Sequence, residues 1–134
     1  MGLWAFGGSM TDTQTTIFDL KEAVHDLCVA KGWGNEDGVQ NPQHVAMAMT
    51  VEMSELLEKF QWLEEKDVQA LLDGRDPGRV LEIAEEFADV MTYGLQLMRC
   101  LDIDVSAQIE RKIGIVLKRP NGVRGRDIKS RSAQ

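Results

Sequence analysis

The sequence predicts an all-α protein, a bundle of four main helices. Apolar residues recur at intervals of three and four residues along most of the chain, which is the period of a helix with one buried face. Asn41-Pro42 and Asp76-Pro77 each combine a helix-capping side chain with a proline suited to the first helical turn. No segment shows the alternation of a strand. A length of 134 residues fits one domain, and 43% hydrophobic residues suffice for a core.

The first two helices are predicted at residues 13–31 and 42–63. Gly32 and Gly34 end the first, and residues 35–41 form a polar loop before the second. Each helix carries an apolar stripe at helical spacing. These stripes comprise Ile17, Leu20, Val24, Leu27 and Cys28 in the first helix, and Val45, Met49, Met53, Leu56 and Phe60 in the second.

A short helical turn is predicted at residues 66–72, followed by helices at 77–101 and 104–118. Asp76-Pro77 opens the longer helix, while Asp102 and Asp104 precede the last. The helix at 77–101 is apolar on nearly every side, which indicates a central position or packing between subunits. We expect its acidic stripe, including Glu82, to face protein rather than bulk water.

We expect a core domain at residues 13–120. Residues 1–12 form an N-terminal extension, and residues 121–134 form a basic tail. The net charge is −7, with +4 on residues 119–134 and therefore −11 on residues 1–118. An acidic body disfavours nucleic acid as a partner, and it would also repel a nucleotide unless cations were bound first.

Cellular location is predicted from the cysteines and the apolar runs. Cys28 and Cys100 form no C-x-x-C motif, so we expect free thiols in a reducing cytoplasm. No apolar run approaches the roughly 18 residues of a membrane span, and the first residues do not resemble a signal peptide.

Two pairs of carboxylates carry the clearest chemical signal. Glu52 and Glu55 lie three residues apart on one helix, and Glu86 and Asp89 repeat that spacing on another. Carboxylates that converge between helices must be neutralised by protons, lysines or divalent cations. A set of four with no histidine or cysteine favours Mg²⁺, or Mn²⁺, over zinc. A solvated acidic surface remains the alternative from spacing alone.

A di-iron site is the competing carboxylate chemistry in a helical bundle. It requires two Glu-x-x-His motifs, whereas only Glu22 and His25 match. Neither residue lies on the apolar stripe of its helix, and we expect His25 to be exposed. This spacing disfavours di-iron.

Two segments of the chain resemble the MazG-like nucleotide pyrophosphohydrolases. The run from Pro42 to Trp62, with Glu52-Met-Ser-Glu55 and Phe60-Gln-Trp62, is similar to the family's first motif, and that from Glu85 to Leu95 to its second acidic motif. The small dCTP pyrophosphatases are the most similar branch. The resemblance implies an all-α fold and a tight homodimer, or a dimer of dimers. It also implies Mg²⁺-dependent cleavage of a nucleoside triphosphate, such as dCTP or another dNTP, to the monophosphate and pyrophosphate in nucleotide-pool cleansing.

The same resemblance implies roles for individual residues. Glu52, Glu55, Glu86 and Asp89 would be the catalytic metal ligands. The substrate-binding residues would be Trp33, Trp62 and Tyr93 around the base and sugar, Lys112 on the phosphates, and Lys31 and His44.

Some positions depart from the family pattern. His44 stands where members commonly have asparagine, Val116 replaces the asparagine expected four residues after Lys112, and Arg119-Pro120 lacks an intervening tyrosine. These departures leave open the choice of substrate. They also leave open a non-catalytic helical module that binds nucleotide or a protein partner.

Overall fold

The computed structural model describes residues 9–121, and every regular element in that range is a helix. The all-α prediction is therefore confirmed for the described residues. The chain divides into two compact units, Met1–Ile103 and Asp104–Gln134, which are treated separately below. Most of the predicted extension at 1–12 and nearly all of the predicted tail at 121–134 lie outside the described residues.

Helix α1 spans Ile17–Lys31 and begins four residues later than predicted. Thr16 takes an extended conformation and forms a capping box with Asp19, in which each side chain accepts a hydrogen bond from the other's backbone amide. This cap fixes the start of the helix, and residues 11–15 form a separate turn before it. Gly32 ends the helix at φ 66°, a left-handed conformation that favours glycine.

Helix α2 spans Pro42–Glu58, and α4 spans Pro77–Cys100. The side chains of Asn41 and Asp76 accept hydrogen bonds from first-turn amides, as the capping prediction requires. The predicted end of α2 at Leu63 is wrong. Helix α3, Glu65–Leu72, needs an extended residue at Glu64 to begin, so the chain leaves helical geometry through a turn at residues 59–62.

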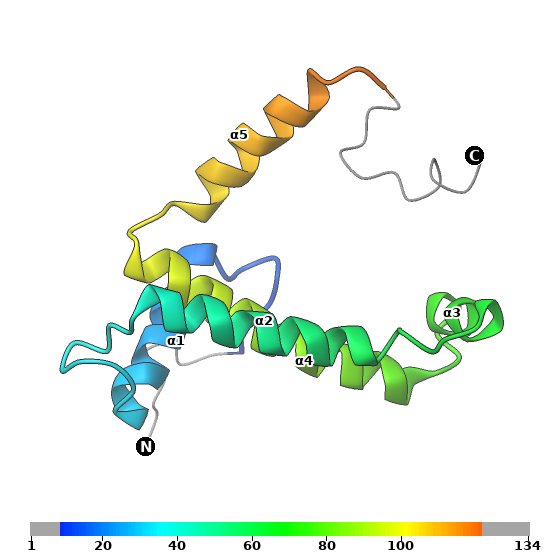
Figure 1. Ribbon diagram of the computed structural model, residues 1–134, viewed down its shortest axis with the longest axis horizontal. Coiled ribbons are helices and arrows are strands. Elements are labelled where there is room, and N and C mark those ends of the chain that lie inside the picture. The colour runs from blue at the N-terminus through cyan, green and yellow to red at the C-terminus, as the bar shows by residue number, and fades with distance from the viewer. Residues whose placement is uncertain (1–8, 122–134) are drawn as a thin grey trace. The chain divides into compact units, whose positions relative to one another are not determined.

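The packing of α2 against α4 is the main contact of the first unit, and α4 also contacts α1 and α3 (Figure 1). A Cβ atom placed on Gly94 would lie 3.3 Å from the terminal methyl carbon of Met49, so the missing side chain permits this close approach. The buried apolar residues among those described lie on α1, α2 and α4; they are Ala23, Cys28, Val45, Val90 and Leu95. Cys28 and the half-buried Cys100 are both free thiols, as predicted.

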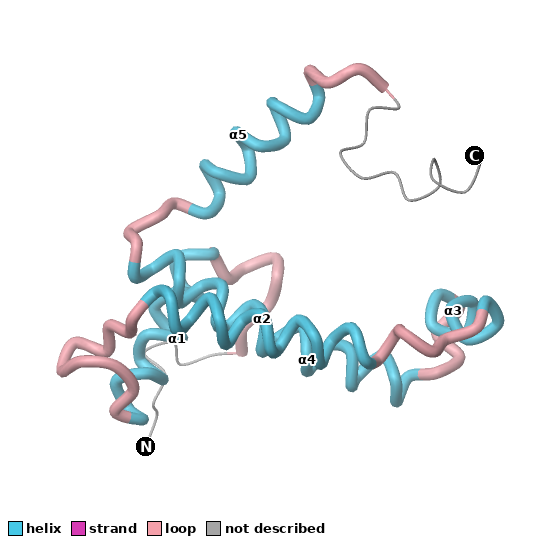
Figure 2. The backbone as a smooth tube through the Cα atoms, in the orientation of Figure 1, coloured by secondary structure: helices cyan, strands magenta, loops and turns pink. Residues whose placement is uncertain are grey.

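In the second unit, α5 spans Val105–Leu117 and confirms the predicted helix there (Figure 2). Asp104 caps it, because its side chain accepts a hydrogen bond from the amide of Ala107 at 2.9 Å. Across residues 9–121, no helix is both long enough and apolar enough to cross a membrane.

Candidate metal centre

The contact between α2 and α4 brings together three of the four predicted acidic residues. Glu52 comes from α2, whereas Glu86 and Asp89 come from successive turns of α4. One carboxylate oxygen from each of the three lies within 4.8 Å of the others. We call this set the acidic cluster. Glu52 and Glu86 are half-buried and Asp89 is exposed, so the cluster opens to solvent on one side.

The electrostatics of the acidic cluster disfavour the charged form of Glu52. Partial burial raises the pKa of Glu52, because removal from water penalises the carboxylate. The negative charge of Glu55, followed by those of Asp89 and Glu86, raises this pKa further. A cation placed among these oxygens would relieve the repulsion.

Glu55 lies on the same helix as Glu52 but is exposed and outside the acidic cluster. Its charge still reaches Glu52, as the pKa of that residue shows. No ion pair engages Glu55 within residues 9–121. Its carboxylate is therefore available at the edge of the cluster.

Lys59 already supplies one positive charge to the acidic cluster. Its ammonium nitrogen lies 3.2 Å from Oε1 of Glu86 and 3.9 Å from Oε2 of Glu82. The hydrogen bond to Glu86 raises the pKa of Lys59 and keeps it charged. Glu82 itself is largely exposed, with 62% of its side chain accessible. The prediction that the α4 acidic stripe faces protein therefore holds for Glu86 and fails for Glu82 and for the exposed Asp89.

Lys59 was not among the residues predicted for the site, although the sequence held a signal for it. It follows Glu52 by seven residues, which places the two about 20° apart on a helix. A lysine at that spacing is well placed to reach the carboxylates beside Glu52. The structure places Lys59 directly after α2, as its C-terminal capping residue, with its ammonium group near Glu86.

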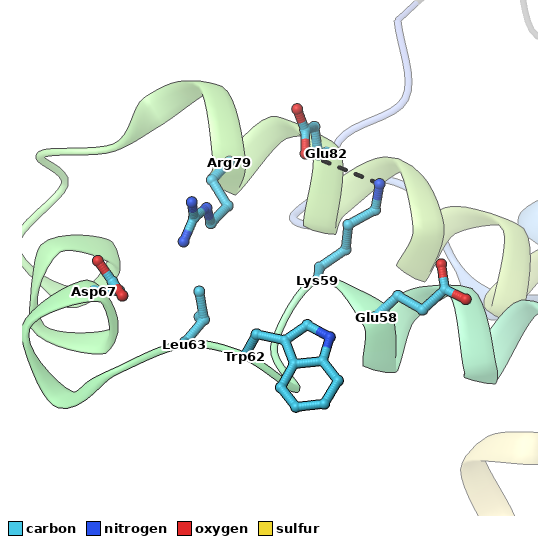
Figure 3. A pocket seen from close by; sticks show the side chains of 7 residues that line it. All are labelled: Glu58, Lys59, Trp62, Leu63, Asp67, Arg79 and Glu82. Atoms are coloured by element: carbon cyan, nitrogen blue, oxygen red, sulfur yellow. Dashed lines mark ion pairs between the residues drawn. The ribbon is translucent and has the colours of Figure 1, made fainter.

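A pocket of about 310 Å³ lies between the end of α2, α3 and the start of α4 (Figure 3). None of the three cluster residues lines it, but Lys59, which pairs with Glu86, does. Lys59 and Arg79 are its two cationic lining residues, and Trp62 and Leu63 add apolar surface. Three carboxylates complete the lining, from Glu58, Asp67 and Glu82. Figure 3 shows Arg79 directed into the space between Asp67 and Lys59, so positive charge enters the pocket from two helices.

Trp62 is 84% exposed and borders this pocket. Trp62 lies in the turn that follows α2, because the helix ends at Glu58. Its exposure leaves one indole surface open for stacking.

The other predicted substrate-binding residues are not gathered at this pocket. Trp33 and Lys31 lie at the C-terminal end of α1, and both are exposed. His44 lies exposed in the first turn of α2, and Tyr93 is half-buried on α4. Lys112 belongs to α5, in the second unit.

The predicted exposure of His25 was wrong, since the residue is half-buried and lines a small cavity with Cys28 and Cys100. Glu22 pairs with Arg99 at 3.0 Å instead of joining a carboxylate site. Among residues 9–121, His25 belongs to no group of converging metal-ligand atoms. The structure thus gives the di-iron alternative no support.

The donor set of the acidic cluster suits a hard divalent cation. On an octahedral Mg²⁺ ion with Mg–O bonds of about 2.1 Å, adjacent oxygens are about 3.0 Å apart and opposite oxygens about 4.2 Å. The three oxygens of the acidic cluster lie within 4.8 Å of one another, so side-chain rotations that bring them closer would be needed to place them on one ion. Three carboxylates leave further coordination positions for water or for oxygens of a ligand.

Comparison with known families agrees with this arrangement. The MazG-like family matches residues 47–133, which is more than half of the chain and includes every member of the acidic cluster. A comparison with curated proteins finds no match. The extent of the family match establishes that the chain belongs to the MazG-like family.

Proposed function

We propose that this protein is a Mg²⁺-dependent nucleoside triphosphate pyrophosphohydrolase, with Mn²⁺ able to replace Mg²⁺. Its substrate is a deoxynucleoside triphosphate such as dCTP, and its products are the monophosphate and pyrophosphate. Membership of the MazG-like family suggests this activity in broad terms. The observation that carries the proposal is the convergence of Glu52, Glu86 and Asp89 within 4.8 Å beside a pocket that contains cationic side chains.

In this proposal Glu52, Glu86 and Asp89 hold the metal, with Glu55 at the edge of the cluster. Bound Mg²⁺ supplies charge neutralisation for the phosphates and acidifies water. Glu55 is the carboxylate best placed to orient the attacking water and accept its proton, because it is exposed and outside the acidic cluster, whereas Glu86 is a proposed metal ligand. The water oxygen bonds to the α-phosphorus, the bond from that phosphorus to the bridging oxygen breaks, and pyrophosphate leaves.

The pocket beside the cluster would receive part of the nucleotide. A largely apolar and flat indole at Trp62 can stack on a base, whereas Lys59 and Arg79 favour phosphate oxygens. Trp33, Tyr93, Lys31, His44 and Lys112 remain proposed contacts from the family resemblance. An excess of seven negative charges makes a nucleotide paired with divalent cations a better ligand than a nucleic acid.

We further propose that the active form is a homodimer or a dimer of dimers. Large apolar side chains on α2 and α4 are exposed in the single chain, which a partner subunit would cover. They include Met47, Val51, Leu57, Leu81 and Phe87, each more than half accessible. We place the activity in cytoplasmic nucleotide-pool cleansing.

A product assay across all canonical dNTPs and NTPs tests this proposal directly. We expect pyrophosphate and the matching monophosphate in the presence of Mg²⁺ or Mn²⁺, and neither product in EDTA. Orthophosphate and a diphosphate as products would contradict attack at the α-phosphorus. Tight, metal-dependent binding of nucleotides without any cleavage would instead establish the non-catalytic binding module.

A further inference from the structure

A metal ion bound to the acidic cluster would compete with Lys59 for the carboxylate of Glu86. Its ammonium nitrogen lies 3.2 Å from Glu86, one of the three residues of the acidic cluster. The side chains of Lys59 and Glu86 are only 29% and 19% exposed, so this pair is better shielded than a typical surface ion pair. In the absence of a metal, Lys59 is therefore the main positive charge that opposes the repulsion within the cluster.

A divalent cation cannot simply be added to this arrangement. The ion would carry two positive charges to the carboxylate that already accepts the lysine hydrogen bond, and the ammonium would repel it at short range. Because Lys59 has a flexible four-carbon stem, displacing its ammonium group requires only side-chain rotation. Metal binding and the Lys59–Glu86 pair are consequently in competition.

A phosphate group bound in the pocket would be a second partner for the displaced ammonium group of Lys59. Lys59 forms part of the pocket wall, and Arg79 reaches the same space from α4 (Figure 3). Phosphate groups entering there would meet Lys59 and Arg79 among three carboxylates, and they would compete with Asp76, which pairs with Arg79 at 3.4 Å. The chemistry that fits this combination is a chain of phosphates, such as the phosphate chain of a nucleoside triphosphate.

We propose that Lys59 is a displaceable counter-ion that binds Glu86 while the acidic cluster lacks metal and binds a substrate phosphate, together with Arg79, once metal has displaced it. This inference rests on the proposed function, because it assumes that the cluster binds a divalent cation. It assigns Lys59 a role in substrate binding and predicts that loss of Lys59 changes the affinities for metal and for nucleotide in opposite directions.

Titration calorimetry on Lys59→Gln tests the two effects separately. For Mn²⁺ alone, we expect the Kd to fall three- to tenfold, since no ammonium needs to be displaced. For a dNTP analogue with a methylene bridge between its α- and β-phosphates, at saturating Mn²⁺, we expect the Kd to rise at least threefold. Lys66→Gln is the matched control. Lys66 pairs with Glu64 at 2.9 Å on exposed α3, and its loss should change either Kd less than twofold.

Lys59→Arg supplies a second variant that retains the charge, and it keeps the test decisive if Lys59→Gln fails to fold. Arginine pairs with a carboxylate through a planar two-donor fork, so it should hold Glu86 more firmly and weaken Mn²⁺ binding at least twofold. Circular dichroism confirms that each variant is folded before titration.

The outcomes separate this inference from the proposed function. If wild type and Lys59→Gln bind Mn²⁺ with equal affinity, the metal site stands and the counter-ion role of Lys59 is overturned. Weaker binding of both Mn²⁺ and the analogue by Lys59→Gln also overturns it. If neither protein binds Mn²⁺, both the inference and the proposed metal-dependent function fail.

Discussion

Helix α4 meets its neighbours at two places that carry carboxylates, and the two differ in charge balance. Near its C-terminal end, Arg99 pairs with Glu22 of α1 at 3.0 Å, one cation for one anion. Midway along α4, Glu86 and Asp89 meet Glu52 of α2, and within the described part of the chain Lys59 is the one cation paired with these three negative charges. The charges of Arg99 and Glu22 balance, whereas the acidic cluster has an excess of negative charge that an added cation would neutralise.

This difference distinguishes a structural ion pair from a candidate binding site. A balanced pair with partners about one-third exposed contributes modestly to stability and needs no ligand. A half-buried cluster with excess negative charge costs free energy in the folded state, which a bound ion can recover. The acidic cluster is therefore expected to lower the stability of the metal-free protein and to raise it when a cation binds.

Removing a carboxylate from the acidic cluster should have the largest effect. Glu86→Gln, Glu52→Gln and Asp89→Asn are each expected to lower turnover by about two to three orders of magnitude, because each removes a proposed metal ligand. Pyrophosphate release from the folded variants, measured at saturating Mg²⁺, checks this. Glu85→Gln is the control for Glu86→Gln, since Glu85 is exposed and outside the cluster.

Near-wild-type turnover in these variants would contradict the assignment of the acidic cluster as a metal-binding site that differs from the Arg99–Glu22 ion pair. Loss of turnover in Glu85→Gln to the same extent would show that general acidity, rather than this cluster, matters.

Replacing the exposed indole should weaken substrate binding without removing the metal. For Trp62→Ala we expect KM to rise about tenfold with a smaller change in kcat, because base stacking is worth about 1–3 kcal/mol. Steady-state kinetics and Mn²⁺ titration measure the two properties. Phe18→Ala, which removes another exposed aromatic residue from α1, should leave both unchanged. An unaltered KM in Trp62→Ala would place the base elsewhere.

Breaking the balanced pair should affect stability and little else. Glu22→Gln is expected to lower the free energy of unfolding by roughly 0.5–1 kcal/mol, the usual range for a partly exposed ion pair. Urea unfolding measures this, and Mn²⁺ affinity should stay within twofold of wild type. A large loss of Mn²⁺ affinity would mean that the two places on α4 are coupled.

The smallest effect concerns the pH dependence of stability without metal. The pKa of Glu52 is raised in the folded protein, so the native state binds more protons than the unfolded state between the two pKa values. Stability should therefore fall as pH rises from the ordinary glutamate pKa of 4.5 through the raised value. Thermal unfolding in EDTA should show this slope, and Glu52→Gln should flatten it. An equal slope in the variant would assign the effect to other groups.

Much of the fold could be predicted from local signals. Asn41-Pro42, Asp76-Pro77 and Asp104 each mark a helix start that the structure confirms, because capping depends on neighbouring residues alone. The end of α2 could not be found in this way. Residues 59–63 have helical periodicity, and only the requirement for an extended Glu64 before α3 takes the chain out of the helix.

For the site, spacing placed the acidic pairs on two helices but could not show which members meet. Glu55 and Asp89 are each the second residue of their pair, yet only Asp89 joins the cluster, since this depends on the rotation of α2 against α4. Arg79 was missed because its relation to the pocket arises from the fold of α3 between α2 and α4. Glu22 and His25 have the same three-residue spacing as the acidic pairs. The structure places Glu22 against Arg99 and His25 beside Cys28 and Cys100.

A crystal structure with Mn²⁺, using its anomalous scattering, tests the central claim most directly. The account predicts an anomalous peak among Glu52, Glu86 and Asp89, about 2.0–2.3 Å from their carboxylate oxygens, and no peak beside Glu22 and Arg99. An Mn²⁺-saturated crystal with no peak at the acidic cluster, and with the three carboxylates still paired only with Lys59 or water, would contradict it.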